Sequence, residues 1–331
     1  MNIILLFGGR GAEHEVSVSS AAYVSTKLYA LGQEVFPVGI AKSGALFLCE
    51  GVPDADWQEG ASPVTVTLEN GTLFLLSDGV RVAPDLVFSV VHGKDGEDGA
   101  WQGLFTLARV PFVGAGVCAS ALGMNKRLAK QLAAACGVPT VPYLAVKRYD
   151  GDLAARVAHR LRYPLFVKPT SGGSSVGVSR VESQAELKHA VELALSEDEE
   201  ALIEEAIDGS ELEVAVLERD GMLLLSPPGE LCAERAFYDY TAKYREKTTR
   251  FFLPARLSLW ETAYVKQLAA SVFRTLGCRD MARVDFFRRK DGKIFFNEIN
   301  TLPGFTEDSL FPRLFSLIGV DAVTFLTEGR A

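Results

Sequence analysis

Two acidic residues and an asparagine stand in a pair of short apolar runs near the C-terminus, with Asp285 in the first run and Glu298 and Asn300 in the second. The Asp291-Gly292 pair between the runs is a strong signal for a two-residue hairpin turn. Such a turn would place Asp285 opposite Glu298 and Arg283 opposite Asn300. All four side chains would share one face, because side chains alternate along a strand.

Facing carboxylates destabilise a sheet unless something neutralises them, and a divalent cation is one way to do so. Two carboxylates and an amide oxygen form an oxygen-only ligand set that suits Mg²⁺ shared with phosphates. No histidine or cysteine stands in the hairpin to favour zinc. The alternative is a solvated charged face in which Arg283 simply pairs with the acids.

A loop rich in serine and glycine follows Lys168, over residues 168–177. The backbone N–H groups and hydroxyls of such a loop can cradle phosphate oxygens beside the lysine. The loop lacks the Gly-Lys-Ser/Thr ending of a Walker A motif, and a flexible linker is the alternative interpretation. Residues 8–11 are a weak dinucleotide fingerprint without the full spaced-glycine pattern, so hydride transfer is disfavoured.

The elements that must position these residues begin as an open, mostly parallel sheet. We expect a buried strand over residues 3–7, a helix over residues 13–31, and a strand over residues 86–91 that runs into a loop rich in Gly and Asp. The stretch 42–79 shows only short apolar runs among Gly, Pro and Asp. Alternating strands and helices of this kind predict an α/β fold.

The pattern changes after residue 122. A helix is expected over residues 125–136 and strands over residues 165–167 and 201–205. Capping boxes, Ser183 with Glu186 and Ser258 with Glu261, predict the starts of two further helices. Two strands, 213–217 and 222–225, are expected to turn at Asp220-Gly221.

These elements predict three domains that pack closely around a shared site. The first, residues 1–122, is the α/β domain with the open sheet. The second, residues 123–209, carries the Ser/Gly loop. The third, residues 210–331, carries the acidic hairpin and a polar, aromatic segment over residues 234–250.

Composition excludes several classes of protein. The chain has 331 residues, 48% of them hydrophobic, and 34 Lys plus Arg against 42 Asp plus Glu give a net charge of −8, which argues against a general nucleic-acid surface. The five cysteines are odd in number and lack CxxC spacing, which favours free thiols in a reducing compartment. No run approaches ~18 apolar residues. We therefore expect a cytoplasmic protein with no membrane partner.

Five segments, taken together, resemble the signatures of the D-alanine–D-alanine ligase family, within the ATP-grasp superfamily of carboxylate-amine ligases. Each segment alone is weak, but all occur in the family's order, within residues 7–310. They are AEHEVS at 12–17, VHGKDGEDG at 91–99, GSSVG at 173–177, FYDYTAKY at 237–244 and NEINTLPG at 297–304. The resemblance implies an ATP-grasp fold, formed by the second and third domains.

The resemblance also implies a nucleotide site. Lysines would contact the ATP phosphates, Glu204 would accept from the adenine amino group, and Glu211 would bind the ribose. Position 206 is alanine where some relatives carry a bulky aromatic residue, so looser packing on adenine is expected. The residues that the resemblance assigns to ATP are Lys126, Lys168, Ser174, Ser175, Glu204, Ala206, Ile207, Glu211 and Lys243. Those assigned to two Mg²⁺ (or Mn²⁺) ions are Asp285, Glu298 and Asn300.

For the substrates, the resemblance assigns Glu15 to the ammonium of the first D-alanine, in a hydrogen-bonded set with Ser174 and Tyr244. Without the motif, Glu15 would be a first-turn acid that complements the helix dipole. Arg283 and the backbone N–H of Gly304 would stabilise a tetrahedral oxyanion. The residues implied for the second substrate are His92, Ser309 and Leu310. A loop histidine bonded to backbone is the alternative for His92.

The implied reaction is ATP-dependent phosphorylation of one D-alanine carboxylate, followed by attack of a second D-alanine amine on the acylphosphate. The dipeptide would serve peptidoglycan synthesis, in a homodimeric enzyme. Family relatives that join D-alanine to D-lactate or D-serine are one alternative, and other ATP-grasp ligases are another. Tyr244 favours an amine as the second substrate. A nucleotide-binding regulatory protein would be expected to lose part of the Arg283, Asp285, Glu298 and Asn300 set.

Overall fold

The N-terminal part is a five-stranded sheet in a computed structural model that describes residues 1–58, 60–69, 72–233 and 249–330. The strand order is β4-β3-β2-β1-β8, and β1 is parallel to both neighbours. Alternate residues of β1 enter two different cores. Ile3, Leu5 and Phe7 pack with the buried face of α1, whereas Ile4 and Leu6 pack with residues around α2. The elements are β1 (Asn2–Gly8), α1 (His14–Ala30), β2 (Glu34–Ile40), β3 (Leu46–Leu48), β4 (Ser62–Pro63), β8 (Leu86–Ser89) and α2 (Ala100–Leu107).

The weakly patterned stretch of the first domain contains a second, three-stranded antiparallel sheet. It consists of β5 (Thr65–Glu69), β6 (Thr72–Ser77) and β7 (Val80–Val82). Leu73 and Leu75 of β6 are buried and join the core that contains Ile4 and Leu6. Tertiary contacts therefore order short apolar runs that carry little local signal on their own.

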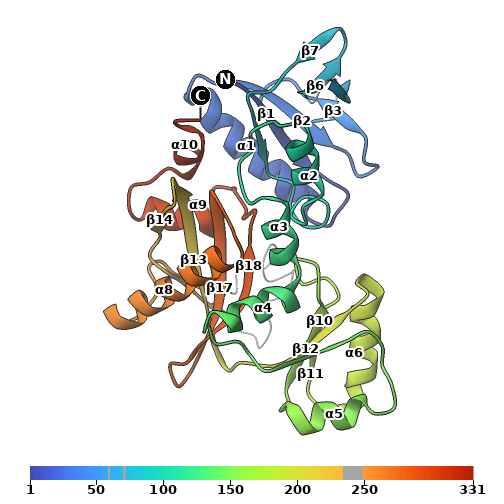
Figure 1. Ribbon diagram of the computed structural model, residues 1–331, viewed down its shortest axis with the longest axis vertical. Helices are drawn as coiled ribbons and strands as arrows, with labels where there is room; N and C mark the ends of the chain where they lie inside the picture. Colours follow the sequence, from blue (N-terminus) through green and yellow to red (C-terminus); the bar gives the residue numbers. More distant parts are fainter. Residues whose placement is uncertain (59, 70–71, 234–248, 331) are drawn as a thin grey trace.

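The central part is a four-stranded antiparallel sheet in the order β11-β10-β12-β9, with two helices packed against it (Figure 1, lower right). Its elements are β9 (Tyr143–Val146), α5 (Leu153–Arg160), β10 (Leu165–Pro169), β11 (Ser179–Val181), α6 (Gln184–Glu197) and β12 (Ala201–Glu205). Two helices, α3 (Val117–Met124) and α4 (Lys126–Ala135), lead into it. The Asn125 side chain caps α4 by accepting from the Leu128 N–H at 2.9 Å.

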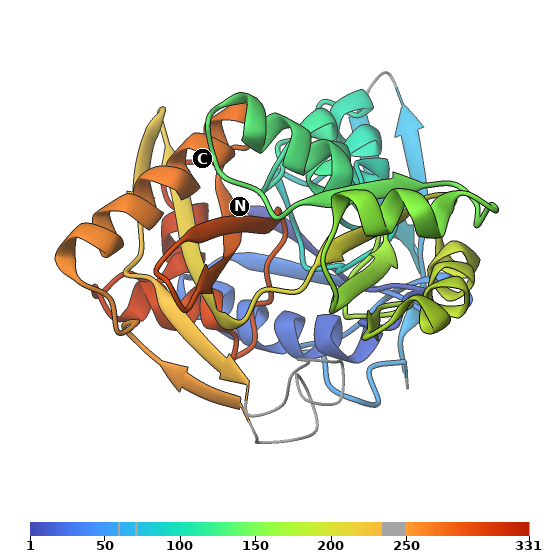
Figure 2. The same cartoon turned by 90° about the horizontal axis from the view of Figure 1, so that it is seen from below.

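The C-terminal part is a six-stranded antiparallel sheet in the order β16-β15-β13-β17-β18, with β14 paired to β13. Seen from below, it lies on the opposite side of the molecule from the central sheet (Figure 2). The turn between β13 and β14 has positive φ at both Asp220 and Gly221, as predicted for an Asp-Gly hairpin. The elements are β13 (Gly209–Arg219), β14 (Met222–Leu225), β15 (Gly229–Ala233), β16 (Thr249–Phe252), α8 (Leu259–Thr275), β17 (Met281–Arg289), β18 (Ile294–Asn300), α9 (Leu310–Ser316) and α10 (Ala322–Thr327).

The two predicted capping boxes have different outcomes. The Ser258 hydroxyl accepts from the Glu261 N–H, and the Glu261 carboxylate accepts from the Ser258 N–H, so the box at α8 is confirmed. At α6 the capping box was wrong, because the Ser183 side chain accepts no hydrogen bond from the helix backbone, although the helix does begin after Ser183 as predicted. There the Glu186 carboxylate accepts instead from the N–H of Glu182, one residue earlier.

The acidic hairpin has the predicted register at the acids but not the predicted turn. Arg289 pairs with Lys293, and the Gly292 N–H donates to the Arg289 carbonyl, so three residues form the loop. A β-bulge between Asp285 and Phe286 then leaves Asn297 as an extra residue on β18. Beyond the bulge Asp285 faces Glu298, and Arg283 faces Asn300. The bulge thus restores the register that the shorter turn would have given.

The largest core joins the first and last parts of the chain. Phe88 of β8 packs edge-on against Phe305, with ring centroids 5.7 Å apart, and Phe305 in turn packs against Phe311 of α9. Both termini consequently lie at the same end of the molecule (Figure 1). Across the described residues, the helices are all too short or too polar to cross a bilayer.

Candidate active site

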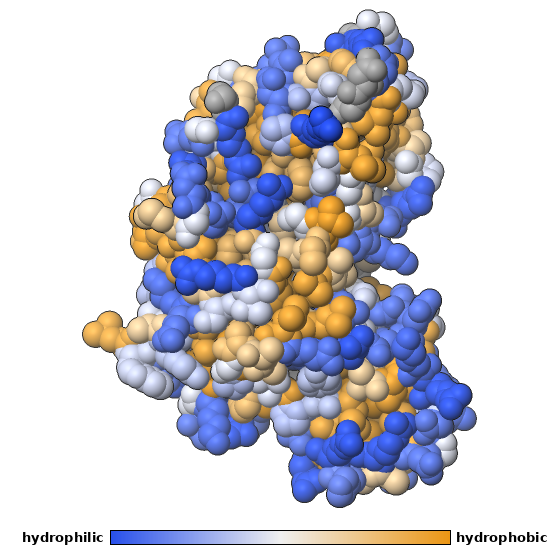
Figure 3. Space-filling model, viewed as in Figure 1, coloured by the Kyte–Doolittle hydropathy of each residue, from blue (hydrophilic) through white to orange (hydrophobic). Residues whose placement is uncertain are grey.

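A cleft of about 1090 Å³ lies where the three parts meet. Its walls come from α1, from the loop after β8, from α3 and α4, from residues 172–174, from β13, β17 and β18, and from the loop before α9. The space-filling view shows the outline of the molecule hollowed between the N-terminal and central parts (Figure 3). Predicted residues from all three parts therefore line one cleft. Six other predicted residues within the described ranges do not line it directly: Lys168, Ser175, Glu204, Ala206, Ile207 and Asp285.

Lysines gather at the end of this cleft next to the central sheet. The Lys126 Nζ donates to the Gly172 carbonyl at 2.6 Å and lies 3.1 Å from the Glu298 carboxylate. The Lys126 N–H also donates to the Thr170 carbonyl, which ties the start of α4 to the Ser/Gly loop. This end of the cleft therefore presents a cation and the backbone of a glycine-rich loop side by side.

Glu204 lies behind this wall, between two lysines. Its two carboxylate oxygens lie 2.8 Å from the Lys130 Nζ and 2.8 Å from the Lys168 Nζ. Burial would raise the pKa of Glu204, but the two ammonium groups outweigh burial and lower it. This carboxylate thus points to the lysines rather than to an open adenine pocket.

The other residues expected along the adenosine follow β12 and begin β13. The Ala206 N–H donates to the Pro164 carbonyl at 2.9 Å, so this backbone donor is used within the protein. Ile207 is half-buried beside it. Glu211 lines the cleft and accepts from the Asn297 amide at 3.4 Å. Asn297 also accepts from Lys168 at 3.4 Å, so it links these two groups.

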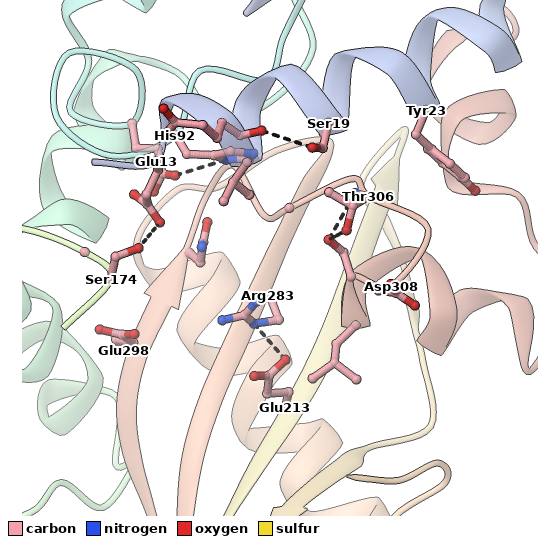
Figure 4. A pocket seen from close by; sticks show the side chains of 18 of the residues that line it. Glu13, Ser19, Tyr23, His92, Ser174, Glu213, Arg283, Glu298, Thr306 and Asp308 are labelled. Atoms are coloured by element: carbon pink, nitrogen blue, oxygen red, sulfur yellow. Dashed lines mark hydrogen bonds and ion pairs between the residues drawn. The ribbon is translucent and has the colours of Figure 1, made fainter. Parts of the chain in front are cut away.

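Arg283 lies among the predicted metal ligands. Its guanidinium makes two bonds to the Asp285 carboxylate, at 2.8 and 2.7 Å, and lies 3.0 Å from Glu213 (Figure 4). Burial would lower the pKa of Arg283, but Asp285 and Glu213 raise it, so the guanidinium stays charged. Asn300 accepts from the Leu302 N–H at 3.0 Å. Sequence reasoning missed Glu213, which pairs directly across the sheet with Asp285.

The donors of this group match a divalent cation in their chemistry, since all are oxygen ligands. In the structure their charge is neutralised by protein cations, with Arg283 on Asp285 and Lys126 on Glu298. Among the described residues, no cluster of three or more His, Cys, Asp or Glu side chains is spaced to hold a metal. The arrangement therefore fits ions that arrive with phosphate oxygens rather than an all-protein cage.

The expected contact between Glu15 and Ser174 was wrong. The Glu13 carboxylate accepts from the Ser174 hydroxyl at 2.5 Å, and the two side chains point toward each other across the cleft (Figure 4). Glu15 is 66% exposed and pairs with Lys42 on the surface. Both acids belong to the same motif and line the cleft, but the contact to Ser174 comes from Glu13, which precedes the first turn of α1. Tyr244 and Lys243 lie outside the described residues.

The Ser/Gly loop holds unusual backbone angles at the contact with Glu13. Ser174 and Ser175 have φ values of 49° and 60°, in the left-handed region that non-glycine residues rarely adopt. Strain of this kind persists only where the surrounding structure enforces it. The bond to Glu13 is one such constraint, and it links the central part of the chain to the N-terminal part.

His92 is buried and bonded on both ring nitrogens. Its Nδ1 lies 3.0 Å from the Leu302 carbonyl, which makes Nδ1 the protonated donor, and its Nε2 lies 3.1 Å from the Ser20 hydroxyl. Ser20 also accepts from the Phe305 N–H at 3.2 Å. Burial would lower the pKa of His92, but the neighbouring Glu97 raises it. The histidine thus holds the loop that carries Gly304, in line with the backbone-bonded alternative.

The loop before α9 is closely packed around Gly304. A Cβ at this position would stand 2.8 Å from the Ser309 hydroxyl, so only glycine fits without a shift. That hydroxyl accepts from the Thr306 N–H at 3.0 Å. Ser309 precedes the first residue of α9, Leu310, whose side chain is buried. These predicted residues therefore lie together at the edge of the cleft.

Four further residues of the site were missed, and only some of them had a signal in the sequence. Lys130 stands one helical turn after Lys126, so an i,i+4 search of the helix would have found it. Glu13 stands two residues before Glu15 in the same motif. Asn297 begins the quoted segment 297–304, but it reaches the site because of the bulge. Ser20 reaches the site because of the packing of α1. Nothing in the sequence around either residue predicts these contacts.

Comparisons with known proteins agree with this geometry. Residues 2–115 match the family model described as D-ala D-ala ligase N-terminus, and residues 132–328 match D-ala D-ala ligase C-terminus. The chain belongs to the D-alanine–D-alanine ligase family. Relatives named D-alanine–D-alanine ligase include one from Mycobacterium tuberculosis, 40% identical over 98% of this chain and 93% of its own length. Another, from Caldicellulosiruptor bescii, is 38% identical over 97% and 91%.

Solved structures of the ligase family superpose over nearly the whole chain. VanG, a D-Ala:D-Ser ligase from Enterococcus faecalis, matches with a TM-score of 0.89 and 36% identity, covering 98% of this chain and 97% of its own. The D-alanine–D-alanine ligase from Coxiella burnetii matches with a TM-score of 0.87 and 33% identity, covering 98% and 91%. The predicted family and the α/β, ATP-grasp fold class are confirmed.

Proposed function

We propose that the protein is an ATP-dependent ligase that joins two molecules of D-alanine, releasing ADP and phosphate, for peptidoglycan precursor synthesis. The observation that carries the proposal is the convergence of three groups in one cleft. These are the lysines beside the Ser/Gly loop, the oxygen ligands around Arg283, and the Gly304 loop held by His92. Family relatives that bear this name support it over nearly the whole chain.

The first step is a phosphoryl transfer. A carboxylate oxygen of the first D-alanine forms a bond to the γ-phosphorus of ATP, and the bond from that phosphorus to the β,γ-bridging oxygen breaks, which releases ADP. Lys126, Lys168 and Lys243 would neutralise the phosphates, and Ser174 and Ser175 would bind their oxygens. Such transfers depend mainly on positioning and on charge stabilisation, which fits a site built from lysines and loop backbone.

Divalent ions are proposed at Asp285, Glu298 and Asn300. Two Mg²⁺ (or Mn²⁺) ions would supply charge neutralisation for the phosphate oxygens. The oxygen-only donor set supports this assignment. Glu298→Ala should then nearly abolish turnover while the protein still unfolds cooperatively, and full activity of this variant would refute the metal site.

The second step is attack by the amine of the second D-alanine on the acylphosphate carbonyl, with loss of phosphate. Arg283 and the Gly304 N–H would stabilise the oxyanion that forms. Ser309 and Leu310 would hold the carboxylate of the second substrate. We assign the ammonium of the first substrate to Glu13 rather than to Glu15, because Glu13 bonds Ser174 whereas Glu15 pairs with Lys42. Tyr244 is proposed to complete that set.

The adenosine is proposed to lie along Glu204, Ala206, Ile207 and Glu211. Glu204 would need to turn from a lysine to accept from the adenine amino group. Alternatively, Glu204 stays with the lysines and only the backbone carbonyls of this segment contact the base. A bound-nucleotide structure distinguishes the two arrangements by the position of the Glu204 carboxylate.

The test is incubation of the purified protein with ATP and Mg²⁺, with measurement of ADP release and dipeptide formation. D-alanine should stimulate ADP release and yield D-alanyl-D-alanine, with one ADP for each dipeptide. L-alanine should give neither product. Absence of D-alanine-dependent ADP release would overturn the proposal.

The other candidate function is a ligase that joins D-alanine to D-serine or D-lactate, because the matching structures include a D-Ala:D-Ser ligase. D-serine or D-lactate added with D-alanine would give the mixed product in preference to D-alanyl-D-alanine if that candidate is right.

We also propose a cytoplasmic location, which the five free cysteines support, and a homodimer, which light scattering would test.

A further inference from the structure

Lys130 is a lysine that the proposed chemistry leaves without a role, although it is among the most buried charged residues of the protein. Its side chain has an exposed fraction of 0%. The Nζ lies 2.8 Å from the Glu204 carboxylate and 3.2 Å from the Phe296 carbonyl, its two polar neighbours on the central and C-terminal sheets. An ammonium group at such depth is costly unless it is paired, so its presence calls for an explanation.

Glu204 is shared between two cations. Its carboxylate faces both Lys130 and Lys168, and Lys168 also donates to the neutral Asn297 side chain. The two lysines differ in access, because Lys168 ends β10 with its side chain 10% exposed, whereas Lys130 is closed off. Only Lys168 can leave the carboxylate for an incoming anion.

We propose that Lys130 is a positioning residue of the nucleotide site, which keeps Glu204 paired when Lys168 turns to the phosphates. Without Lys130, a phosphate that recruits Lys168 would leave a buried carboxylate with no counter-ion. Breaking a buried ion pair in this way is strongly unfavourable. With Lys130 present, the carboxylate keeps one partner and the surplus positive charge becomes available to the ligand. The inference rests on the proposed nucleotide site.

The experiment compares two ligands that differ only in their phosphates, ADP and adenosine, binding to the full-length protein in buffer with Mg²⁺. Lys130→Met removes the buried ammonium with little change in volume. Its matched control is Lys188→Met, which removes a surface lysine of α6 whose side chain is 64% exposed. The double variant Lys130→Met with Glu204→Gln removes the carboxylate as well, so no buried charge is left unpaired. Thermal unfolding checks that each variant is folded.

Lys130→Met should weaken ADP binding by about tenfold or more and adenosine binding by less than about twofold, because only the phosphates recruit Lys168. The double variant should recover most of the lost preference for ADP over adenosine. Equal losses for both ligands, or a double variant no better than the single one, would overturn the role of Lys130. Failure of the wild-type protein to bind ADP would instead refute the proposed function.

Discussion

The two ends of the cleft hold their charges in different ways. At the lysine end, Lys126 lines the cleft and Lys130, Lys168 and Glu204 lie behind it, and ammonium and carboxylate groups pair directly. At the Glu13 end, formed by Glu13, Ser174, His92 and Ser20, hydroxyls, imidazole and backbone groups make the contacts. The lysine end thus has a surplus cation, suited to phosphates, and the Glu13 end a surplus acid, suited to an ammonium group.

Replacement of Arg283, which belongs to neither end, should have the largest effect, because it removes the cation that two buried acids share. Arg283→Met leaves the carboxylates of Glu213 and Asp285, both nearly fully buried, without their shared partner. We expect a loss of about 3–5 kcal/mol in the free energy of unfolding, measured with urea, and no detectable ligase turnover.

Two controls separate charge from shape at this position. Arg283→Lys keeps the charge but loses the two-bond fork to Asp285, so it should retain more stability than Arg283→Met. Added Mg²⁺ should restore part of the stability of Arg283→Met if the freed carboxylates take up the ion. Unchanged stability of Arg283→Met would mean that the two acids are not held by this arginine.

The pair Glu13→Gln and Glu15→Gln tests the Glu13 end alone. Glu13→Gln removes the surplus acid that bonds Ser174, so turnover should fall by about 100-fold. Glu15→Gln changes an exposed acid of the same motif that pairs with Lys42, and its turnover should stay within about twofold of wild type. D-alanine-dependent ADP release measures both. A larger loss of turnover in Glu15→Gln than in Glu13→Gln would show that Glu15, and not Glu13, binds the substrate ammonium.

The fold and most of the cleft were predictable from sequence where the signal is local. The Asp220-Gly221 turn and the α8 capping box depend on neighbours in the chain, and both are present as predicted. The acid register was right although the turn was not, because a bulge on β18 compensates for a longer loop. A local pattern can thus predict the correct cross-strand partners while giving the wrong length for the turn between the strands.

Contacts between distant segments were the part that sequence reasoning missed. The distinction between Glu13 and Glu15 depends on which acid lies at the start of α1 facing Ser174, 161 positions away in the chain. The pairing of Glu204 with Lys130 and Lys168 depends on how α4, which packs against β18 of the C-terminal sheet, lies next to β12 of the central sheet. No spacing rule within one element carries that information.

Ser20→Ala tests how the Glu13 end positions its backbone. Ser20 links the His92 ring to the Phe305 N–H, next to Gly304, and the variant leaves both partners unsatisfied in a buried site. We expect a loss of about 1–3 kcal/mol in unfolding free energy and roughly a tenfold fall in kcat, with the KM for ATP unchanged. Ser196→Ala, at an exposed position of α6 away from the cleft, is the matched control. A change in the KM for ATP alone would contradict this role.

The smallest expected effect is a difference in pH dependence between the two ends. The pKa of His92 is raised because Glu97 outweighs the effect of burial, so the folded protein holds this proton more tightly than the unfolded chain. That stabilisation is complete below the unfolded histidine pKa of about 6.5 and is lost as pH rises through the folded value. Glu204 behaves oppositely, since its lowered pKa adds stability above the unfolded value of about 4.5, which disappears only as pH falls.

Between about pH 6 and pH 8, therefore, only the Glu13 end should respond. The unfolding free energy of wild type, measured with urea, should fall across this interval more than that of His92→Gln, because the variant lacks the titrating imidazole. Glu204→Gln should follow the wild-type slope there and diverge only below about pH 5. Equal slopes for wild type and His92→Gln would show that His92 holds the Gly304 loop as a neutral ring whose affinity for a proton does not change on folding.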